Sequence, residues 1–349
     1  MVRRSKCGRN DPCTCGSTNK FKKCCAEKIN AEWVGANFLE DLRIAIIEEM
    51  KHRGFSIRKK KQNSIDEVSR IYFNLLKRLP KAKPRQVHRS RELTDKILTD
   101  ALATVLNTIA DFSQRGNSLQ PFLHRLLEHS DFNDRLLNDW GVLHFHLGGV
   151  TPESDGYVSR SNDLLFAFVT DTDFYMLDIM SHPPLDRLPP ASTSTSWAAH
   201  ELIEVLHRNW PAVIARYRVP DEGMGHLLSD AERADMRAGG VVACTKLADG
   251  TVYFPPGGGY MTTGLSKNVL VESDKLLDYM QTLERDMRSR AEDYIDVIVN
   301  STGKSFNRLN YRLRATRSVV GTAAIFVPTE LSGFSVIETQ SGIELFVGP

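Results

Sequence analysis

Residues 163–182, DLLFAFVTDTDFYMLDIMSH, contain two apolar runs that are separated by the polar stretch Asp171-Thr172-Asp173. Runs of this length that are rich in Phe, Leu, Val and Ile are typical of strands. A short polar stretch between two such runs indicates a tight hairpin. The sequence therefore predicts a pair of antiparallel strands here, and the neighbouring segments are interpreted around this pair.

A third strand is predicted upstream, where residues 138–149 read NDWGVLHFHLGG. Because side chains alternate between the two faces of a strand, His144 and His146 should share one face. Leu143, Phe145 and Leu147 should then lie on the other face. A three-stranded antiparallel unit that is flanked by helices belongs to the α+β class.

The cysteines are concentrated at the N-terminus, with five of the six inside the first 25 residues. Cys13, Cys15, Cys24 and Cys25 follow the spacing C-x-C-x8-C-C. Four thiolates in a segment too small to bury a core are what a structural, tetrahedral Zn²⁺ site requires. We therefore expect one structural Zn²⁺ per chain, bound by these four cysteines.

The segments GRNDPC, CGS and KKCC make residues 8–27 resemble the SEC-C motif, a short zinc-binding module first known from the tail of the bacterial secretion ATPase. Thr14 stands where the family usually has proline, and Phe21 stands where tyrosine is common. The resemblance implies a docking module for other proteins or for ribosomes and RNA. It carries little information about catalysis.

Helical spacing of apolar residues follows the zinc module, with helix starts expected at Asn37 and Ser64 and a long helix ending at Gly116. The expected fold class is α+β, with a small N-terminal zinc module, an α-helical domain and then antiparallel-sheet α+β units. The expected ranges are 1–28 for the zinc module, 29–137 for a basic α-helical domain, 138–220 for a RelE-like catalytic domain and 221–349 for a C-terminal α+β domain.

The composition, 41% hydrophobic and 25% charged, is that of an ordinary soluble globular protein. The longest apolar runs fall far short of the roughly 18–20 residues that span a bilayer. We therefore expect a cytoplasmic protein with no membrane span.

Residues 51–91 carry fourteen Lys and Arg side chains against Asp66 and Glu67. This density favours a polyanionic partner such as RNA, because neutralising phosphates releases counterions. The alternative is a solvated surface whose charge is balanced by acidic residues folded nearby. The candidate phosphate contacts are Arg58, Lys59, Lys60 and Lys61, with Arg308, Arg312 and Arg314 along a later strand.

His146 at a strand end, Asp163 before the LLF run and His182 at the next strand end resemble the RelE-like ribonuclease toxins of the YafQ branch. The loop between His146 and Asp163 is much longer here than in that family. The resemblance implies cleavage of RNA.

The same residues suit RNA cleavage on chemical grounds, because attack by a 2′-hydroxyl needs a base, an acid and a cation for the developing phosphate charge. Histidine serves both proton-transfer roles near pH 7. The hypothesis is a metal-independent endoribonuclease of toxin or phage-defence type. Its candidate catalytic residues are His144, His146, Arg160, Asp163 and His182.

Two alternatives stay open at this point. The first is a non-catalytic adaptor that binds nucleic acid, ribosomes or proteins and whose histidines are structural. The second is a metal-dependent nuclease, in which the H-x-H strand and a third histidine or Asp178 hold the metal. The hypotheses differ in whether His144, His146, Arg160 and His182 converge.

Overall fold

The structure is a computed structural model that describes residues 34–181, 200–220, 239–303, 309–315, 334–340 and 344–346, with the short pieces 10–12, 18–20, 23, 228–229, 232–233 and 235–236. The chain divides into two compact units. Unit 1 combines residues 1–69 with 272–349, and unit 2 comprises residues 70–271. This grouping differs from the four successive ranges that the sequence suggests, because its boundaries lie inside helices α3 (Ile65–Arg78) and α10 (Lys267–Ser289).

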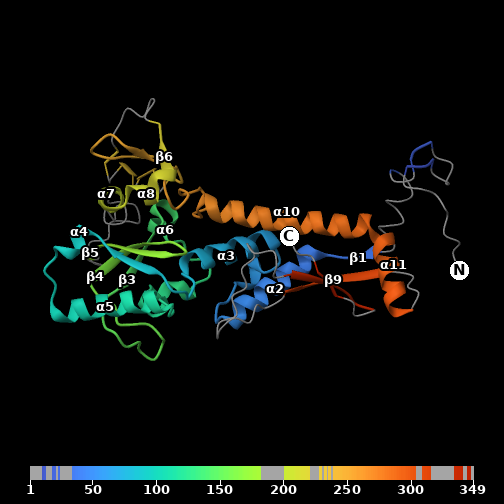
Figure 1. Cartoon of the computed structure of the whole chain (residues 1–349), viewed down its shortest axis with the longest axis horizontal. Helices are drawn as coiled ribbons and strands as arrows, with labels where there is room; N and C mark the ends of the chain where they lie inside the picture. Colours follow the sequence, from blue (N-terminus) through green and yellow to red (C-terminus); the bar gives the residue numbers. More distant parts are fainter. Residues whose placement is uncertain are drawn as a thin grey trace. The chain divides into compact units, whose positions relative to one another are not determined.

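The main sheet of unit 2 confirms the α+β class and the predicted antiparallel strands (Figure 1). Its order is β2-β5-β4-β3, and the hairpin between β4 and β5 closes where the Thr170 amide donates to the Asp173 carbonyl oxygen at 2.9 Å. The strands are β2 (Gln86–Arg89), β3 (Val142–His146), β4 (Asp163–Val169) and β5 (Asp173–Ser181).

Strand β2 lies inside the range 29–137, for which the sequence suggests an α-helical domain. It pairs in parallel with β5, from Gln86 opposite Asp173 to Arg89 opposite Met176. The local sequence gives little sign of a strand, because two prolines precede a short polar segment. The pairing comes from tertiary structure, since β5 offers an open edge to which these backbone groups can bond.

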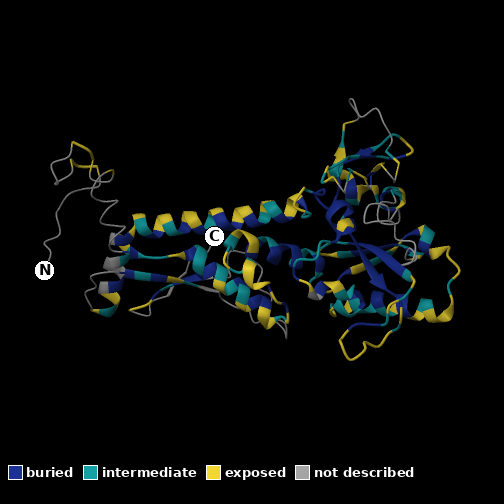
Figure 2. Cartoon of the chain, turned by 180° about the vertical axis from the view of Figure 1, so that it is seen from behind, coloured by how far each residue is buried: buried dark blue, intermediate teal, exposed yellow. Residues whose placement is uncertain are grey.

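Both faces of this sheet are covered, and its strands β3, β4 and β5 are mostly buried (Figure 2). Leu143, Phe145 and Leu165 pack in one cluster with residues of α5 (Asp100–Arg115). Val142, Phe166 and Leu164 pack in a second cluster with α7 (Glu201–Asn209). The predicted alternation along β3 is therefore confirmed, and it separates the two cores.

The remaining elements of unit 2 are short. A small sheet has the order β6-β8-β7. The bounds are β6 (Arg218–Val219), β7 (Thr245–Lys246), β8 (Val252–Tyr253), α4 (Arg91–Thr94), α6 (Arg135–Trp140) and α8 (Pro211–Ile214), with 3-10 turns η3 (Gln120–Phe122), η4 (Arg125–Glu128) and η7 (Ala215–Tyr217). The predicted end of α5 at Gly116 is confirmed, because this residue adopts φ +78° in the left-handed region.

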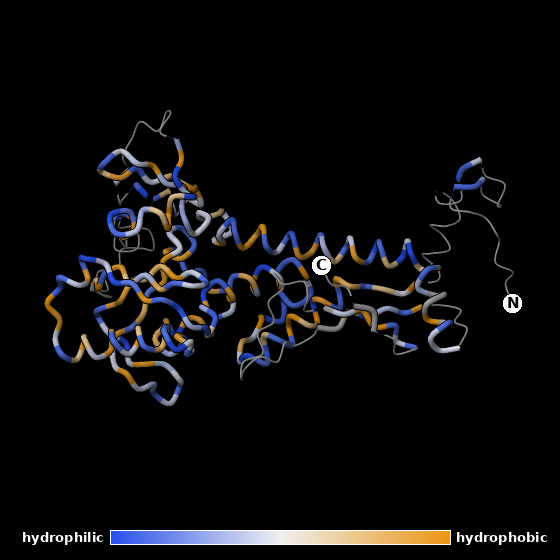
Figure 3. Tube along the Cα trace, viewed as in Figure 1, coloured by the Kyte–Doolittle hydropathy of each residue, from blue (hydrophilic) through white to orange (hydrophobic). Residues whose placement is uncertain are grey.

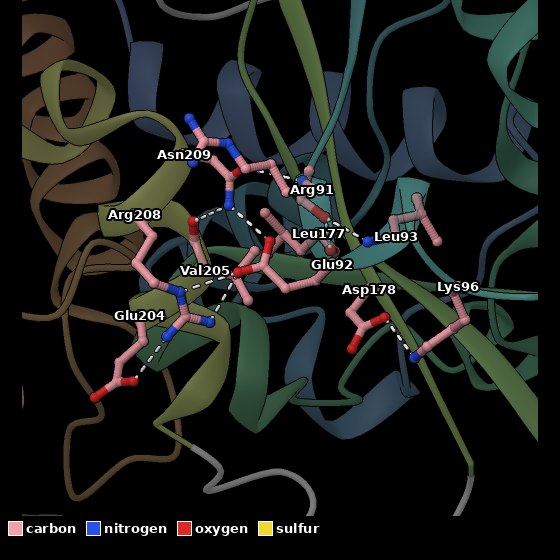
Figure 4. A network of polar contacts seen from close by, with 11 residues as sticks. Arg91, Glu92, Leu93, Lys96, Leu177, Asp178, Glu204, Val205, Arg208 and Asn209 are labelled. Atoms are coloured by element: carbon pink, nitrogen blue, oxygen red, sulfur yellow. Dashed lines mark hydrogen bonds and ion pairs between the residues drawn. The ribbon is translucent and has the colours of Figure 1, made fainter.

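Polar contacts connect α4 to α7 beside β5 (Figure 4). The Arg208 Nε donates to Glu92 at 3.0 Å, and the Asn209 amide donates to the other Glu92 oxygen at 2.8 Å. Lys96 binds Asp178 at 2.6 Å. These contacts fix the helix pair and occupy Asp178.

Unit 1 has a sheet of order β1-β9-β10-β11, whose strands come from both ends of the chain. The bounds are β1 (Val34–Gly35), β9 (Leu309–Ala315), β10 (Phe334–Glu338), β11 (Glu344–Phe346), α2 (Phe38–His52), the 3-10 turn η2 (Lys59–Lys61) and α11 (Ala291–Thr302). The predicted caps are confirmed, since Asn37 accepts from the Glu40 amide at 3.1 Å and Ser64 from the Glu67 amide at 3.3 Å.

Helix α10 is mainly hydrophilic, with hydrophobic residues recurring along it (Figure 3). Those that are buried include Leu276, Met280 and Leu283. This spacing is typical of a helix with one packed face. Within the residues that the structure describes, no helix is both long enough and apolar enough to cross a membrane.

Candidate functional site

Three histidine rings come together at the edge strand β3. The ring centroids of His144 and His146 lie 6.3 Å apart, and those of His124 lie 6.0 and 5.7 Å from them. His124 was not among the residues expected from the sequence. No local pattern marks it, because only tertiary packing brings the segment before η4 against β3.

The rings of this cluster are held in a buried environment. His144 is 6% exposed and His146 is 5% exposed. The Nδ1 of His124 accepts from the Leu126 amide at 2.9 Å, and the Nδ1 of His146 accepts from the Ser161 amide at 3.5 Å. His144 and His146 are therefore part of the interior, whereas His124 is half-buried, and an RNA strand would reach the two buried rings only after this region opened.

A buried carboxyl group lies beside the cluster. Asp134 caps α6 by accepting from the Leu137 amide at 3.0 Å, and its other oxygen is 3.7 Å from the Nδ1 of His144. Burial raises the pKa of Asp134, although the Leu137 hydrogen bond and the charges of Arg78 and Lys77 oppose this. His144 therefore lies beside a buried carboxyl group, Asp134, that is itself close to the positive charges of Arg78 and Lys77.

The other candidate catalytic residues in the described part of the chain have different surroundings from the buried histidines. Arg160 is exposed in the loop between β3 and β4. Asp163 begins β4, and its side chain accepts from the Ser181 hydroxyl at 2.9 Å. His182 lies outside the described residues.

A metal site on the H-x-H strand gains no support from the described part of the chain. None of its His, Cys, Asp and Glu side chains form a group of three or more that could hold a metal ion. Asp178 is bound to Lys96 and is separated from His144 by strand β4, where Phe166 pairs with both positions.

A buried lysine fixes the glycine-rich loop of unit 2, residues 256–264, which read PGGGYMTTG. The Lys77 ammonium group donates to the Gly257 carbonyl at 2.6 Å, to Ser266 at 2.8 Å and to Asn138 at 3.4 Å. A Cβ on Gly257 would lie 2.2 Å from the Leu137 carbonyl oxygen, so only glycine allows this approach. The loop is a tight structural turn.

The basic run of unit 1 forms the turn η2, in which Arg58, Lys59 and Lys60 are exposed and Lys61 is half-buried. Gln62 fixes the turn by donating to the Ile57 carbonyl at 2.7 Å and by accepting from Arg43. No carboxylate among the described residues forms an ion pair with Lys59, Lys60 or Lys61. The turn therefore presents lysines whose charge is not neutralised by an ion pair there.

The predicted phosphate contacts on β9 have a different setting. The Arg312 guanidinium binds Asp41 at 2.7 Å, and the Leu313 amide donates to the other Asp41 oxygen at 2.9 Å. Arg312 thus connects β9 to α2, although its side chain is 60% exposed. Arg308 and the side chain of Arg314 lie outside the described residues.

The four zinc-ligand candidates, Cys13, Cys15, Cys24 and Cys25, also lie outside the described residues. Around them, Pro12 pairs with Lys20 in an antiparallel bridge, and the Lys23 amide donates to the Lys20 carbonyl at 2.8 Å. The chain therefore reverses between residues 12 and 20. The chemistry of the four thiolates fits Zn²⁺.

Comparison with known proteins identifies one feature of the chain. The family model of the SEC-C motif, which is often zinc-binding, matches residues 9–27. No curated protein and no solved structure matches the chain. The resemblance of the central strands to RelE-like toxins is not supported by these comparisons.

The buried Lys77 generates a prediction about stability and pH. Burial lowers its pKa from 10.5 to about 7, so between these values the unfolded chain binds one more proton than the folded chain. Raising the pH from 7 to 10 should therefore increase the free energy of unfolding of the wild type, relative to that of Lys77→Met, by a few kcal/mol. Urea unfolding across this range measures the difference.

The matched control is Lys275→Met, because Lys275 is 67% exposed. Its free energy of unfolding should run parallel to that of the wild type. If the free energy of unfolding of Lys77→Met also runs parallel to that of the wild type across this pH range, the lowered pKa assigned to Lys77 is contradicted.

Proposed function

We propose that the chain is an RNA-binding adaptor that docks through its zinc module and the cationic turn at residues 58–61. The observation that carries this proposal is the exposure of Lys59 and Lys60 on a turn held by Gln62. Because these lysines form no ion pair with a described carboxylate, their charge is available to a polyanion. A fixed turn also loses little conformational entropy on binding.

The location of the histidines favours an adaptor over a nuclease. An RNA-cleaving site must let a ribose and its phosphate approach within hydrogen-bond distance of the acid and the base. His144 and His146 are almost completely buried and contribute to the interior between β3 and the turn η4. Their rings pack against each other and against His124, and the His144 ring also packs against Phe166.

The cationic turn predicts a salt-dependent affinity for RNA. Each phosphate contact to single-stranded RNA changes the slope of log affinity against log salt by about 0.7, so Lys59→Gln with Lys60→Gln should flatten the slope by about 1.4. The measurement is fluorescence anisotropy with a short single-stranded RNA at several salt concentrations. The control variant, Lys267→Gln with Lys275→Gln, removes two exposed lysines of α10 and should keep the original slope. A slope that both variants leave unchanged would exclude the turn as an RNA contact.

The zinc module predicts one structural Zn²⁺ per chain. Protein purified under reducing conditions should contain about one equivalent of zinc, and Cys24→Ser with Cys25→Ser should lose it, because two of four thiolate ligands are then missing. Elemental analysis gives the metal content, and circular dichroism should report a largely folded chain. Cys244→Ser is the control, since Cys244 is a free, half-buried cysteine outside the motif. Metal-free wild type would rule out this assignment.

A second candidate function is a metal-independent endoribonuclease of toxin or phage-defence type. The observation that favours it is the convergence of three rings, His124, His144 and His146, within 5.7 to 6.3 Å of one another. Two histidines at such a distance can act as acid and base if the region opens toward substrate.

Cleavage assays separate the two candidates. The adaptor proposal expects the wild type to bind RNA and leave it intact in the presence of EDTA. The second candidate instead expects products with 2′,3′-cyclic phosphate ends, and a loss of about 10²- to 10⁴-fold in rate for His146→Asn. RNA binding by His146→Asn, measured alongside, separates lost chemistry from lost folding.

A further inference from the structure

Unit 2 contains a pocket that is independent of both the histidine cluster and the cationic turn. Its volume is about 840 Å³, which lies within the range of roughly 300–1,000 Å³ for small-molecule sites. The segments that line it include the β4–β5 hairpin, the end of α3 with residues 79–85 before β2, residues 212–217 of α8 and η7, and the glycine-rich loop at residues 256–257.

The lining of this pocket carries an excess of positive charge. Its cations are Lys81, Arg85 and Arg216, and its carboxylates are Asp171 and Asp173, while the buried Lys77 is held by the glycine-rich loop. Both carboxylates are already engaged by side chains outside the lining. Asp171 binds Lys83 at 2.9 Å, and Asp173 binds His88 at 2.8 Å. The cations of the pocket therefore favour an anionic ligand.

Arg85 is buried and hydrogen-bonded to the backbone. It is 6% exposed, and its Nε and one terminal nitrogen donate to the carbonyl oxygens of Thr170 at 2.8 Å and Lys83 at 3.2 Å. These bonds fix the plane of the guanidinium group before any ligand arrives. A fixed, planar guanidinium is suited to phosphate, which it binds through paired N–H donors.

Aromatic side chains line the same pocket. Tyr217 is half-buried, and the Arg216 guanidinium lies 4.8 Å from its ring centroid. Tyr175 packs against two other rings. The His88 ring stacks on it with the ring centroids 4.7 Å apart, and the Trp210 ring centroid lies 5.0 Å away. An aromatic surface beside fixed cations is the combination that binds a nucleobase together with its phosphate.

We propose that this pocket binds a nucleoside monophosphate group, with the phosphate at Arg85 and Lys81 and the base against Tyr217. The group can belong to a free nucleotide or to the terminal nucleotide of an RNA strand. This inference goes beyond the proposed function and does not rest on it, since the residues of the pocket belong to unit 2 and the cationic turn belongs to unit 1.

Isothermal titration calorimetry on the full chain tests the proposal. The ligands are AMP, UMP, the corresponding nucleosides, and a short RNA with and without a 5′-phosphate. Saturable binding should require the phosphate. Lys81→Gln should weaken binding of the monophosphates about tenfold, which corresponds to the loss of one charge-assisted contact. Tyr217→Leu should weaken it by a similar factor through lost stacking.

The variants are chosen to keep the test decisive. Lys81 is half-buried and Tyr217 is partly exposed, so their replacement disturbs folding less than replacement of the buried Arg85. Lys246→Gln lies outside the pocket and should bind like the wild type. Lys59→Gln with Lys60→Gln should also leave AMP binding unchanged, which separates this pocket from the RNA-binding proposal.

The source of the ligand follows from the two sets of titrations. Tighter binding of AMP or UMP than of the 5′-phosphorylated RNA identifies a free nucleotide, and the reverse order identifies a strand end. The proposal is overturned if no phosphorylated ligand binds, if nucleosides bind equally well, or if folded Lys81→Gln and Tyr217→Leu both bind like the wild type.

Discussion

The hydrogen-bonded pairing of β4 with β5 is the interaction on which the architecture of unit 2 depends. Both strands are buried on both faces, so their backbone amides and carbonyls cannot be satisfied by water and must bond to neighbouring strands. β4 then offers its outer edge to β3, and β5 offers its outer edge to β2. The hairpin end of the pair also forms one wall of the cationic pocket.

The edge position of β3 explains the character of its histidines. An edge strand has one side without a neighbouring strand, and the ring of His124, from the segment before η4, lies against the two histidine rings of β3. Buried imidazoles can both donate and accept, which lets them meet a mixed environment of backbone amides and the Asp134 carboxyl group. Their proximity alone therefore does not identify a catalytic centre.

Local features of the fold could be predicted from the sequence, because they depend on residues close together in the chain. The caps at Asn37 and Ser64, the helix end at Gly116 and the β4–β5 hairpin belong to this group. Non-local features could not. The parallel pairing of β2 with β5, the approach of His124 to β3 and the bonds from Lys77 to the glycine-rich loop all join distant segments, and no short pattern records them. The strand that carries His144 and His146 could thus be predicted, whereas the residues that surround it, such as His124, could not.

The composition of unit 1 from both ends of the chain has a consequence for the order of events during translation. All four strands of the main sheet in unit 2 have been synthesised once residue 181 emerges. β1, by contrast, pairs with β9, which begins at Leu309. Domains generally fold as units while synthesis proceeds from the N-terminus. Helix α2 and strand β1 must therefore wait, with their apolar faces uncovered, until β9 has been synthesised.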